Sequence, residues 1–400
     1  MAKALRTLVF RLHRFVGRMA ILLFALSFCT GVLLLFAPEI EQIDRPDFWV
    51  SGLDPERHAT LGQTYDAVMS AYPDLHIEVI APSVRPWLGD KTLGWLPDRG
   101  RVTVWTRPDT GAVIGISGDG TIRLLEALAA LHTDLMLPRG WGRLLVTAMS
   151  LVLLFSVISG LMSYRRFWKG FLRRPSAEMN PRMRAGVWHR LVAVWVAPFL
   201  LVMGLTGGVF LLHAAGFQAR SGGGFEPVAA RDAVVPAGFT GAVLDRAMAE
   251  LRQQVPGFRL KVAGFPGDAE GVFDLSGYDA RSGSAFSEIG ARIDPSGGRL
   301  LGVSSAARGN FLARIDALVY ALHFGEWGGF ASILLWGVFG LSSLVLLFMG
   351  ARVYVARSRA PGARTGPVAA SLAYLRGLSV FGLGYLALAA LIAREILRRL

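Results

Sequence analysis

Four of the seven histidines in this 400-residue chain fall into two matched pairs. His13 and His189, here called the inner pair, are each followed at once by an arginine, Arg14 or Arg190, and each stands before a long apolar run. A Thr-Gly dipeptide follows both histidines at the same distance, seventeen residues further along. The repeated spacing indicates an internal duplication of the chain.

His132 and His323, here called the outer pair, lie in the stretches LAALHTDL and VYALHFGE. Each closes an apolar helical stretch and leads into another apolar run, and the stretches GLMSY and GARVY follow at nearly equal distances. Placing an ionisable side chain at membrane depth costs free energy, so such residues usually have a function. Neutral imidazole is a common metal ligand. We therefore predict that both pairs are ligands. His213, without a counterpart, is a further candidate for a ligand or a substrate contact.

The split of these histidines into two pairs limits the metals that they could bind. A tetrahedral zinc site takes four ligands, commonly with thiolates or carboxylates among them, whereas the two pairs are separated by about 30 Å of membrane. Two imidazoles in an apolar bundle fit the axial positions of a haem iron, and Arg14 and Arg190 could pair with haem propionates. The single cysteine, Cys29, leaves no C-x-x-C-H for covalent attachment. The alternative is that each histidine is an interfacial residue bonded to a neighbour.

The composition is that of a membrane protein with sizeable water-exposed parts, since 53% of the residues are hydrophobic and 18% are charged. Five stretches without charge are Met19–Ala37, Leu144–Tyr164, Leu191–Phe217, Gly328–Ala351 and Gly377–Ala393. At 1.5 Å of rise per residue, the first four are long enough for helices that cross the membrane. The fifth is shorter and arginines follow it. We expect it to cross as well, with a helix lying at the inner interface as the alternative.

The net charge of +13 is unevenly distributed. Segments 1–18, 164–190 and 352–376 are strongly basic, whereas the two long polar stretches between the spans are mixed in sign. Basic loops remain on the cytoplasmic side, so we expect the N-terminus and the loop 164–190 inside and both polar stretches outside. The basicity follows from topology and predicts no nucleic-acid partner.

Each outside region has the pattern of a helix followed by strands, with turns rich in Asp, Pro, Ser and Gly. The expected helices are 60–72 and 242–255, and the expected strands are 76–81, 101–107, 112–117, 258–265, 271–277, 285–293 and 299–303. The predicted fold is an α-helical transmembrane bundle with two outside α+β modules. The predicted segments are 1–37 (start and first span), 38–143 (first module), 144–217 (second and third spans with their basic loop), 218–327 (second module), 328–351 (fourth span) and 352–400 (basic loop and fifth span).

The His-Arg pair before the first span, the paired outside modules and the Leu-His before the second and fourth spans resemble the PepSY-associated transmembrane family over about residues 5–356. The pieces RVTVWTRPDTGAVIGI and SEIGARIDPSGGRLLGV resemble PepSY modules. Bacterial members include multi-pass inner-membrane reductases of ferric siderophores, such as ferrioxamine or ferripyoverdine, with two haem b groups. The resemblance implies periplasmic modules, two bis-histidine haem b groups on the inner and outer pairs, and electron transfer outward to iron. It also implies a ferric siderophore and other iron-uptake components, such as a periplasmic binding protein, as partners beside the membrane lipid.

Other motifs restrict the remaining functions. The sequence has no G-x-G-x-x-G after a strand and no P-loop, so we expect electrons from a separate cytoplasmic donor. It has no Ser-His-Asp grouping and no HExxH, so hydrolysis has no support. The main alternative is a non-enzymatic PepSY membrane module that binds a peptide, a peptidase or a ligand. A transporter would need paired carboxylates or broken helices in the spans, and neither is present.

Overall fold

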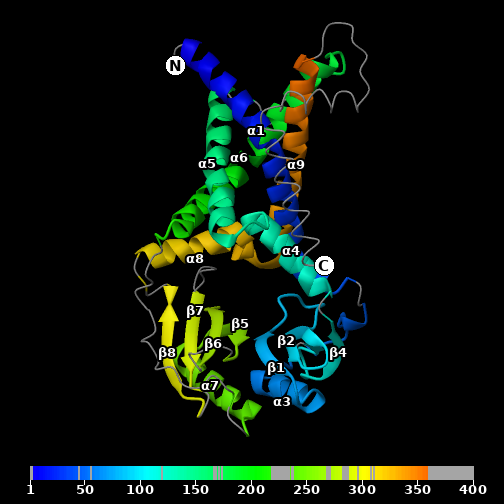
Figure 1. The fold of residues 1–400 in the computed structure, drawn as a ribbon, viewed down its shortest axis with the longest axis vertical. Coiled ribbons are helices and arrows are strands. Elements are labelled where there is room, and N and C mark those ends of the chain that lie inside the picture. The colour runs from blue at the N-terminus through cyan, green and yellow to red at the C-terminus, as the bar shows by residue number, and fades with distance from the viewer. Residues whose placement is uncertain are drawn as a thin grey trace.

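The computed structural model describes residues 3–358 apart from 44–45, 55, 119, 165–168, 170–171, 173, 218–234, 236–237, 267–271, 282–287, 295–296, 307–308 and 310. In this part of the chain, four long helices form a bundle, and an antiparallel sheet lies beyond one end of it (Figure 1). Two shorter helices lie crosswise between the bundle and the sheet. The expected fifth span, Gly377–Ala393, lies outside the described residues.

The four bundle helices are long and apolar enough to cross a membrane. They are α1 (Lys3–Leu35), α5 (Arg139–Ser163), α6 (Pro181–Ala214) and α9 (Gly329–Ser358). Two of them begin well before the apolar runs: α1 starts at Lys3, and α6 starts after Asn180, whose side chain accepts a hydrogen bond from the backbone of Met183 at 2.9 Å. Both histidines of the inner pair therefore lie inside helices.

The bundle has α1 and α6 at opposite corners, because α1 packs against α5 and α9 and α6 packs against the same two helices. Its core contains Phe24 of α1, Val157 of α5, Phe199 of α6 and Trp336 of α9. Many other apolar side chains of these helices point outward and are exposed. An apolar outer surface on a bundle of this length is suited to lipid rather than to water.

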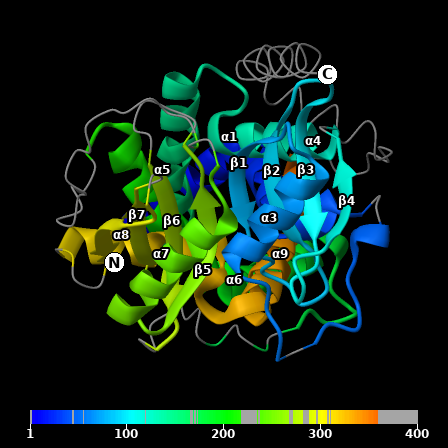
Figure 2. The same ribbon diagram turned by 90° about the horizontal axis from the view of Figure 1, so that it is seen from below.

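In the described residues, the strands of both predicted modules form a single sheet of eight strands in the order β4-β3-β2-β1-β5-β6-β7-β8. The strands are β1 (His76–Ala81), β2 (Asp90–Leu96), β3 (Gly100–Thr106), β4 (Val113–Ser117), β5 (Phe258–Gly264), β6 (Phe273–Asp279), β7 (Glu288–Ile293) and β8 (Leu300–Ser305). The modules meet at β1 and β5, where Val79 lies opposite Gly264 and Ile80 opposite Ala263. Figure 2 shows the first module on one side of this junction and the second on the other. Each predicted module thus has the expected helix and strands, but the strands of the two modules join into one sheet.

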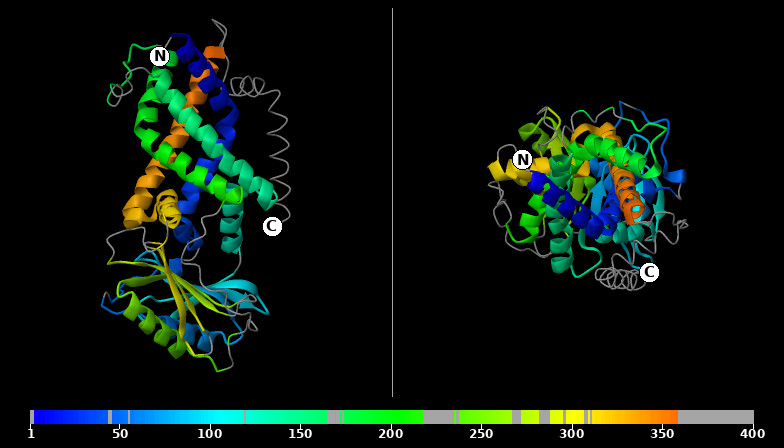
Figure 3. Two further views of the ribbon diagram at one scale, coloured as in Figure 1. Left: turned by 90° about the vertical axis from the view of Figure 1, so that its left-hand side faces the viewer. Right: turned by 90° about the horizontal axis from the view of Figure 1, so that it is seen from above.

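The helices α3 (Leu61–Ala71) and α7 (Gly241–Gln254) cover the face of the sheet that is turned away from the bundle (Figure 3). They cross at Gly62 and Gly241, and an aspartate four residues after each glycine bonds to the other helix. Asp66 accepts from the backbone N–H of Gly241 at 2.7 Å, and Asp245 accepts from that of Gly62 at 2.9 Å. The reciprocal bonds follow directly from the duplication.

The glycines at this crossing are expected to be required for stability. A Cβ on Gly62 would lie 2.2 Å from the carbonyl oxygen of Gly241, so Gly62→Ala should force the helices apart. Overpacking of this kind costs about 1–3 kcal/mol, and we expect a lower midpoint in thermal unfolding of the purified protein. The control is Gly118→Ala, because a Cβ there meets no atom of the described residues within 4 Å. Equal midpoints for the two variants would contradict the expectation.

The two crosswise helices are α4 (Gly120–Asp134) and α8 (Phe311–Phe324), which lead into α5 and α9. Each carries one histidine of the outer pair near its C-terminal end. α4 packs against α1 and α5, and α8 packs against α6. The outer pair therefore lies where the bundle meets the sheet layer, as predicted for the outer approaches to the second and fourth spans.

Candidate functional site

The inner pair joins diagonally opposite helices of the bundle. His13 on α1 bonds through Nδ1 to Ser159 Oγ of α5 at 3.1 Å, and His189 on α6 bonds through Nδ1 to the Leu346 carbonyl of α9 at 3.3 Å. The two rings are close enough to interact electrostatically. The structure thus brings together the two histidines that the first repeat motif predicts as a pair.

The outer pair is held by the same two long helices at their other ends. His132 Nδ1 lies 3.0 Å from Thr30 Oγ1 and 3.1 Å from the Ser27 carbonyl, both on α1. His323 Nδ1 lies 2.8 Å from Thr206 Oγ1 on α6. These threonines belong to the Thr-Gly dipeptides that follow the inner histidines. Each long helix therefore carries an inner histidine and, about 25 Å further along, the hydroxyl that orients an outer one.

The hydrogen bonds of the hydroxyl groups are compatible with one tautomer for three of the rings. Thr30 Oγ1 donates its hydrogen to the Leu26 carbonyl at 2.8 Å, and Thr206 Oγ1 donates to the Val202 carbonyl at 2.8 Å. Ser159 Oγ donates in the same way to the backbone of its own helix. A hydroxyl has one hydrogen, so with that hydrogen on the helix carbonyl each of these oxygens can accept from the Nδ1–H of its histidine.

The fourth ring, His189, has a carbonyl as its partner, and a carbonyl can only accept. Two of the four rings, His132 and His189, thus face a carbonyl through Nδ1, and the partners of the other two are compatible with the same tautomer, with the hydrogen on Nδ1 and the lone pair on Nε2. Among the residues that the structure describes, none forms a hydrogen bond with any of these Nε2 atoms. A ring held through Nδ1–H with a free Nε2 is the arrangement that metal-bound histidines adopt.

The pKa values of both outer rings are lowered. Burial, above all, and the neighbouring His132 lower the pKa of His323 to about 4. Burial also lowers the pKa of His132, although its hydrogen bond to the Ser27 backbone acts in the opposite direction. Both shifts favour the unprotonated imidazole, the form that binds a metal.

Glycines on the facing helices make room for three of the four rings. A Cβ on Gly31 would lie 3.0 Å from Cε1 of His132, and one on Gly160 would lie 3.3 Å from Cε1 of His13. Gly350 stands in the same relation to His189, also at 3.3 Å. Each ring thus packs directly against a helix backbone. Gly160 and Gly350 are the first residues of the repeated stretches GLMSY and GARVY, which gives those stretches a role.

The donor set fits a haem iron better than other common metal centres. Across the described residues, no group of three or more His, Cys, Asp or Glu side chains is placed to bind a metal ion, so a tetrahedral zinc site of that kind is not formed there. Two imidazoles whose Nε2 atoms are unbonded within the described residues, inside an apolar helical bundle, would suit a haem iron, for which histidine is a common ligand.

The arginines of the motif lie beside aromatic rings. The guanidinium carbon of Arg14 is 5.8 Å from the ring centre of Phe10, and that of Arg190 is 5.6 Å from that of Tyr164. Both arginines are exposed and, within the described residues, neither forms an ion pair. Their pairing with propionates stays a prediction. Arg18, which sequence reasoning missed, donates to the hydroxyl of Tyr354 at 2.9 Å.

His213 contacts an aspartate and is part of neither histidine pair. Its Nε2 lies 3.1 Å from Asp316 Oδ1 of α8. Its ring centre is 6.2 Å from that of Phe210, which in turn packs edge-on against His323 at 5.0 Å. His213 therefore joins α6 to α8 beside the outer pair, and its candidacy as a ligand has no support from this geometry.

Comparison with known proteins agrees with this architecture. The family described as PepSY-associated TM region matches residues 10–357, a range that contains both histidine pairs. The chain is also 29% identical over 220 residues to an uncharacterized protein of Pseudomonas aeruginosa, PA4219, and the match covers 51% of this chain and 54% of that protein. The chain thus spans about half the length of this curated relative.

Proposed function

Because the chain belongs to the family of PepSY-associated transmembrane proteins, we propose that it is a di-haem electron-transfer protein of the bacterial inner membrane that reduces ferric siderophores in the periplasm. One observation carries the proposal. Both histidine pairs are held through Nδ1 at two different depths of one bundle, and no described residue bonds to their Nε2 atoms. Two stacked sites divide the passage of an electron across the membrane into shorter steps.

The chain's own residues would fix the geometry of each site. Bound haem would supply one-electron chemistry between ferric and ferrous iron. Ser159 and Leu346 orient the inner rings, and Thr30 and Thr206 orient the outer rings. The apolar side chains of the bundle exclude water, and exclusion of water together with the imidazole hydrogen bonds sets the potential of such a group.

The direction of transfer comes from topology. The inner pair borders the basic segments that we place in the cytoplasm, so an electron donor on that side would reduce it first. The outer pair lies where the sheet joins the bundle, and a ferric siderophore bound by the sheet layer would be close to it. Siderophore oxygens are hard ligands that suit Fe(III) better than Fe(II), so reduction would release the iron.

The function predicts a direct measurement. Purified, haem-loaded protein that has been reduced chemically in detergent should be reoxidised by a ferric siderophore, with Fe(II) appearing in a ferrous-selective chelator. Stopped-flow absorbance against several ferric siderophores gives the rate. Thr206→Val, which removes the hydroxyl that orients His323, should slow this step while the inner haem keeps its spectrum.

The second candidate function is a non-enzymatic module whose sheet binds a peptide, a peptidase or a ligand. The observation that favours this alternative is the sheet of eight strands in the described residues, because this sheet is large and contains neither histidine pair. A colourless purified protein would support this alternative. Intact haems that no ferric siderophore reoxidises faster than buffer would leave electron transfer to a different acceptor and contradict the reductase function.

A further inference from the structure

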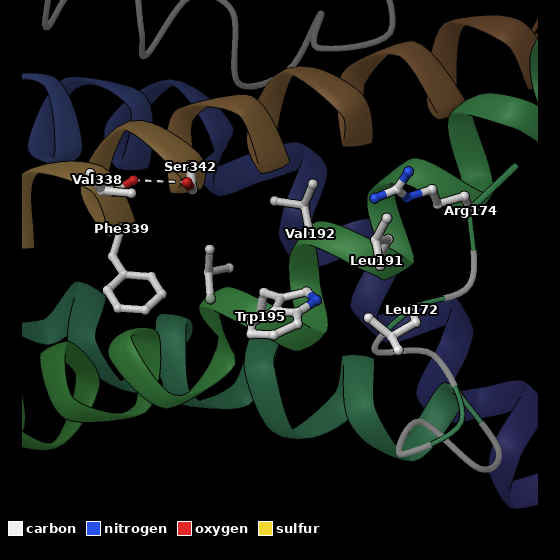
Figure 4. Close-up of a pocket in the computed structure, with 9 residues that line it drawn as sticks. Leu172, Arg174, Leu191, Val192, Trp195, Val338, Phe339 and Ser342 are labelled. Atoms are coloured by element: carbon white, nitrogen blue, oxygen red, sulfur yellow. Dashed lines mark hydrogen bonds between the residues drawn. The ribbon is translucent and has the colours of Figure 1, made fainter. Parts of the chain in front are cut away.

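A cavity of about 370 Å³ lies between α6 and α9 in the cytoplasmic half of the bundle (Figure 4). The helices line it with Leu191, Val192, Trp195, Val196, Val338, Phe339 and Ser342, and Leu172 and Arg174 lie at one end. The apolar run of α6 begins at Leu191, so the lining of α6 lies within about 10 Å of the inner edge of the hydrocarbon layer. The side chains of Trp195 and Val338 are about half exposed (51% and 60%), so the cavity opens toward lipid.

The lining combines aromatic rings with a single hydroxyl. Trp195 and Phe339 provide the rings. Ser342 Oγ donates its hydrogen to the Val338 carbonyl at 2.7 Å, so its lone pairs are left to accept a hydrogen bond. A flat ring that carries O–H groups could stack on the aromatic side chains and donate to Ser342. A phosphate headgroup would need a cluster of basic side chains, and among the described residues the lining contains one, Arg174.

The cavity adjoins the inner pair. Val192 lies about one helical turn beyond His189 on α6, and Ser342 lies about one turn from Leu346, whose carbonyl holds the His189 ring. Val196 belongs to the core of the bundle. A molecule in the cavity would therefore be separated from the inner pair by little more than one layer of side chains.

The two halves of the duplicated chain differ at this place. The repeat aligns Trp195 with Met19, because His189 aligns with His13. It aligns Phe339 with Met149 and Ser342 with Val152, because Gly350 aligns with Gly160. The first half therefore has neither the rings nor the hydroxyl at the equivalent positions. The helices of the first half pack in the same bundle without these side chains. The rings and the hydroxyl of the cavity are therefore not needed for helix packing.

We propose that this cavity is the entry site of a membrane quinol, the two-electron reductant that supplies the inner pair. The inference rests on the proposed function and names its donor. The quinol ring lies between Trp195 and Phe339 with one O–H donated to Ser342, and its isoprenoid tail extends into the lipid. Oxidation breaks its two O–H bonds and gives a quinone, two protons released to water on the cytoplasmic side, and two electrons. These electrons leave singly through the inner and outer sites and reduce two Fe(III) ions outside.

The test uses the full, haem-loaded chain in nanodiscs of defined phospholipid without quinone. A photoreactive azido-benzoquinone reports binding through mass spectrometry of the labelled peptides, and a short-chain benzoquinol reports the rate of haem reduction through absorbance. The variant exchanges the lining for that of the other half: Trp195→Met, Phe339→Met and Ser342→Val. The control exchanges Met19→Leu and Met149→Leu at the equivalent place in the first half.

The wild type and the control should be labelled on α6 and α9, and the triple variant should bind about tenfold more weakly, as loss of a hydrogen bond and ring contacts predicts. Its reduction by quinol should slow by a similar factor, while its reoxidation by ferric siderophore after chemical reduction stays normal. Labelling outside α6 and α9, labelling that is unchanged in the triple variant, or labelling that added phospholipid alone abolishes would overturn the inference. Failure of siderophore reoxidation with normal labelling would instead count against the proposed function alone.

Discussion

Replacing His189 by alanine is expected to remove the haem of the inner site and to leave that of the outer site. Under the proposed function, the change deletes one of the two histidines that would hold the inner haem and leaves His13 alone at that depth, so the iron would become high-spin or the haem would be lost. His13→Ala should have the same effect, whereas His132→Ala and His323→Ala should affect the other haem. Haem content per chain should fall by about half in each variant, as measured by pyridine haemochrome absorbance.

The matched control for these variants is His213→Ala. His213 lies on α6 like His189, but it is paired with Asp316 and belongs to neither site. The His213→Ala variant should keep both haems and their low-spin spectra. If His189→Ala and His213→Ala lost the same amount of haem, or if all four ligand variants kept wild-type spectra, the assignment of the pairs would be wrong.

Replacing Gly350 by valine is expected to disable the inner site without touching any ligand. A Cβ on Gly350 already lies 3.3 Å from Cε1 and 3.5 Å from Nδ1 of His189, and the γ-methyl groups of valine would occupy the space of the ring. The His189 ring would have to turn away from the Leu346 carbonyl, and its Nε2 would leave the axis on which His13 completes the pair. We expect loss of the inner haem and retention of the outer one in absorbance spectra.

A second glycine on the opposite helix separates this steric effect from a general effect of valine in a helix. Gly186 lies on α6 itself, three residues before His189, and a Cβ there meets no atom of the described residues within 4 Å. Gly186→Val should therefore leave both haems in place. Equal haem content in the two valine variants would contradict this steric explanation.

Much of the fold could be predicted because membrane spans and duplicated modules leave strong patterns. The apolar runs predicted the four bundle helices, and the alternating patterns predicted seven of the eight strands. The missed strand was β2, whose sequence DKTLGWL begins with Asp and Lys and contains Gly, residues that are depleted in strands. The joining of the modules into one sheet could not be predicted either. The contact between β1 and β5 is tertiary and leaves no periodic pattern in the sequence.

The site was only partly predictable for a similar reason. Histidine is rare at membrane depth, so its type and repeated position predicted both pairs. The partners of the rings are Ser, Thr and backbone carbonyl groups, which are common in transmembrane helices and carry no signal by themselves. The spacing from His13 to Thr30 was visible in the sequence, but only the structure shows that this threonine serves the ring of His132. The roles of Gly160 and Gly350 likewise depend on which helices are neighbours.

Each of the long helices α1 and α6 carries a residue of the inner site and a residue of the outer site, and this restricts how the chain can change during evolution. His13 and Thr30 must keep both their separation and their relative direction around α1, since one serves each site. One inserted residue between them would turn the threonine by about 100° and move it by about 1.5 Å along the axis, away from His132. The apolar residues between them can be exchanged freely for others of similar size, whereas their number cannot change. Sequence divergence in α1 and α6 should therefore proceed by substitution, with insertions and deletions confined to the loops and the sheet layer.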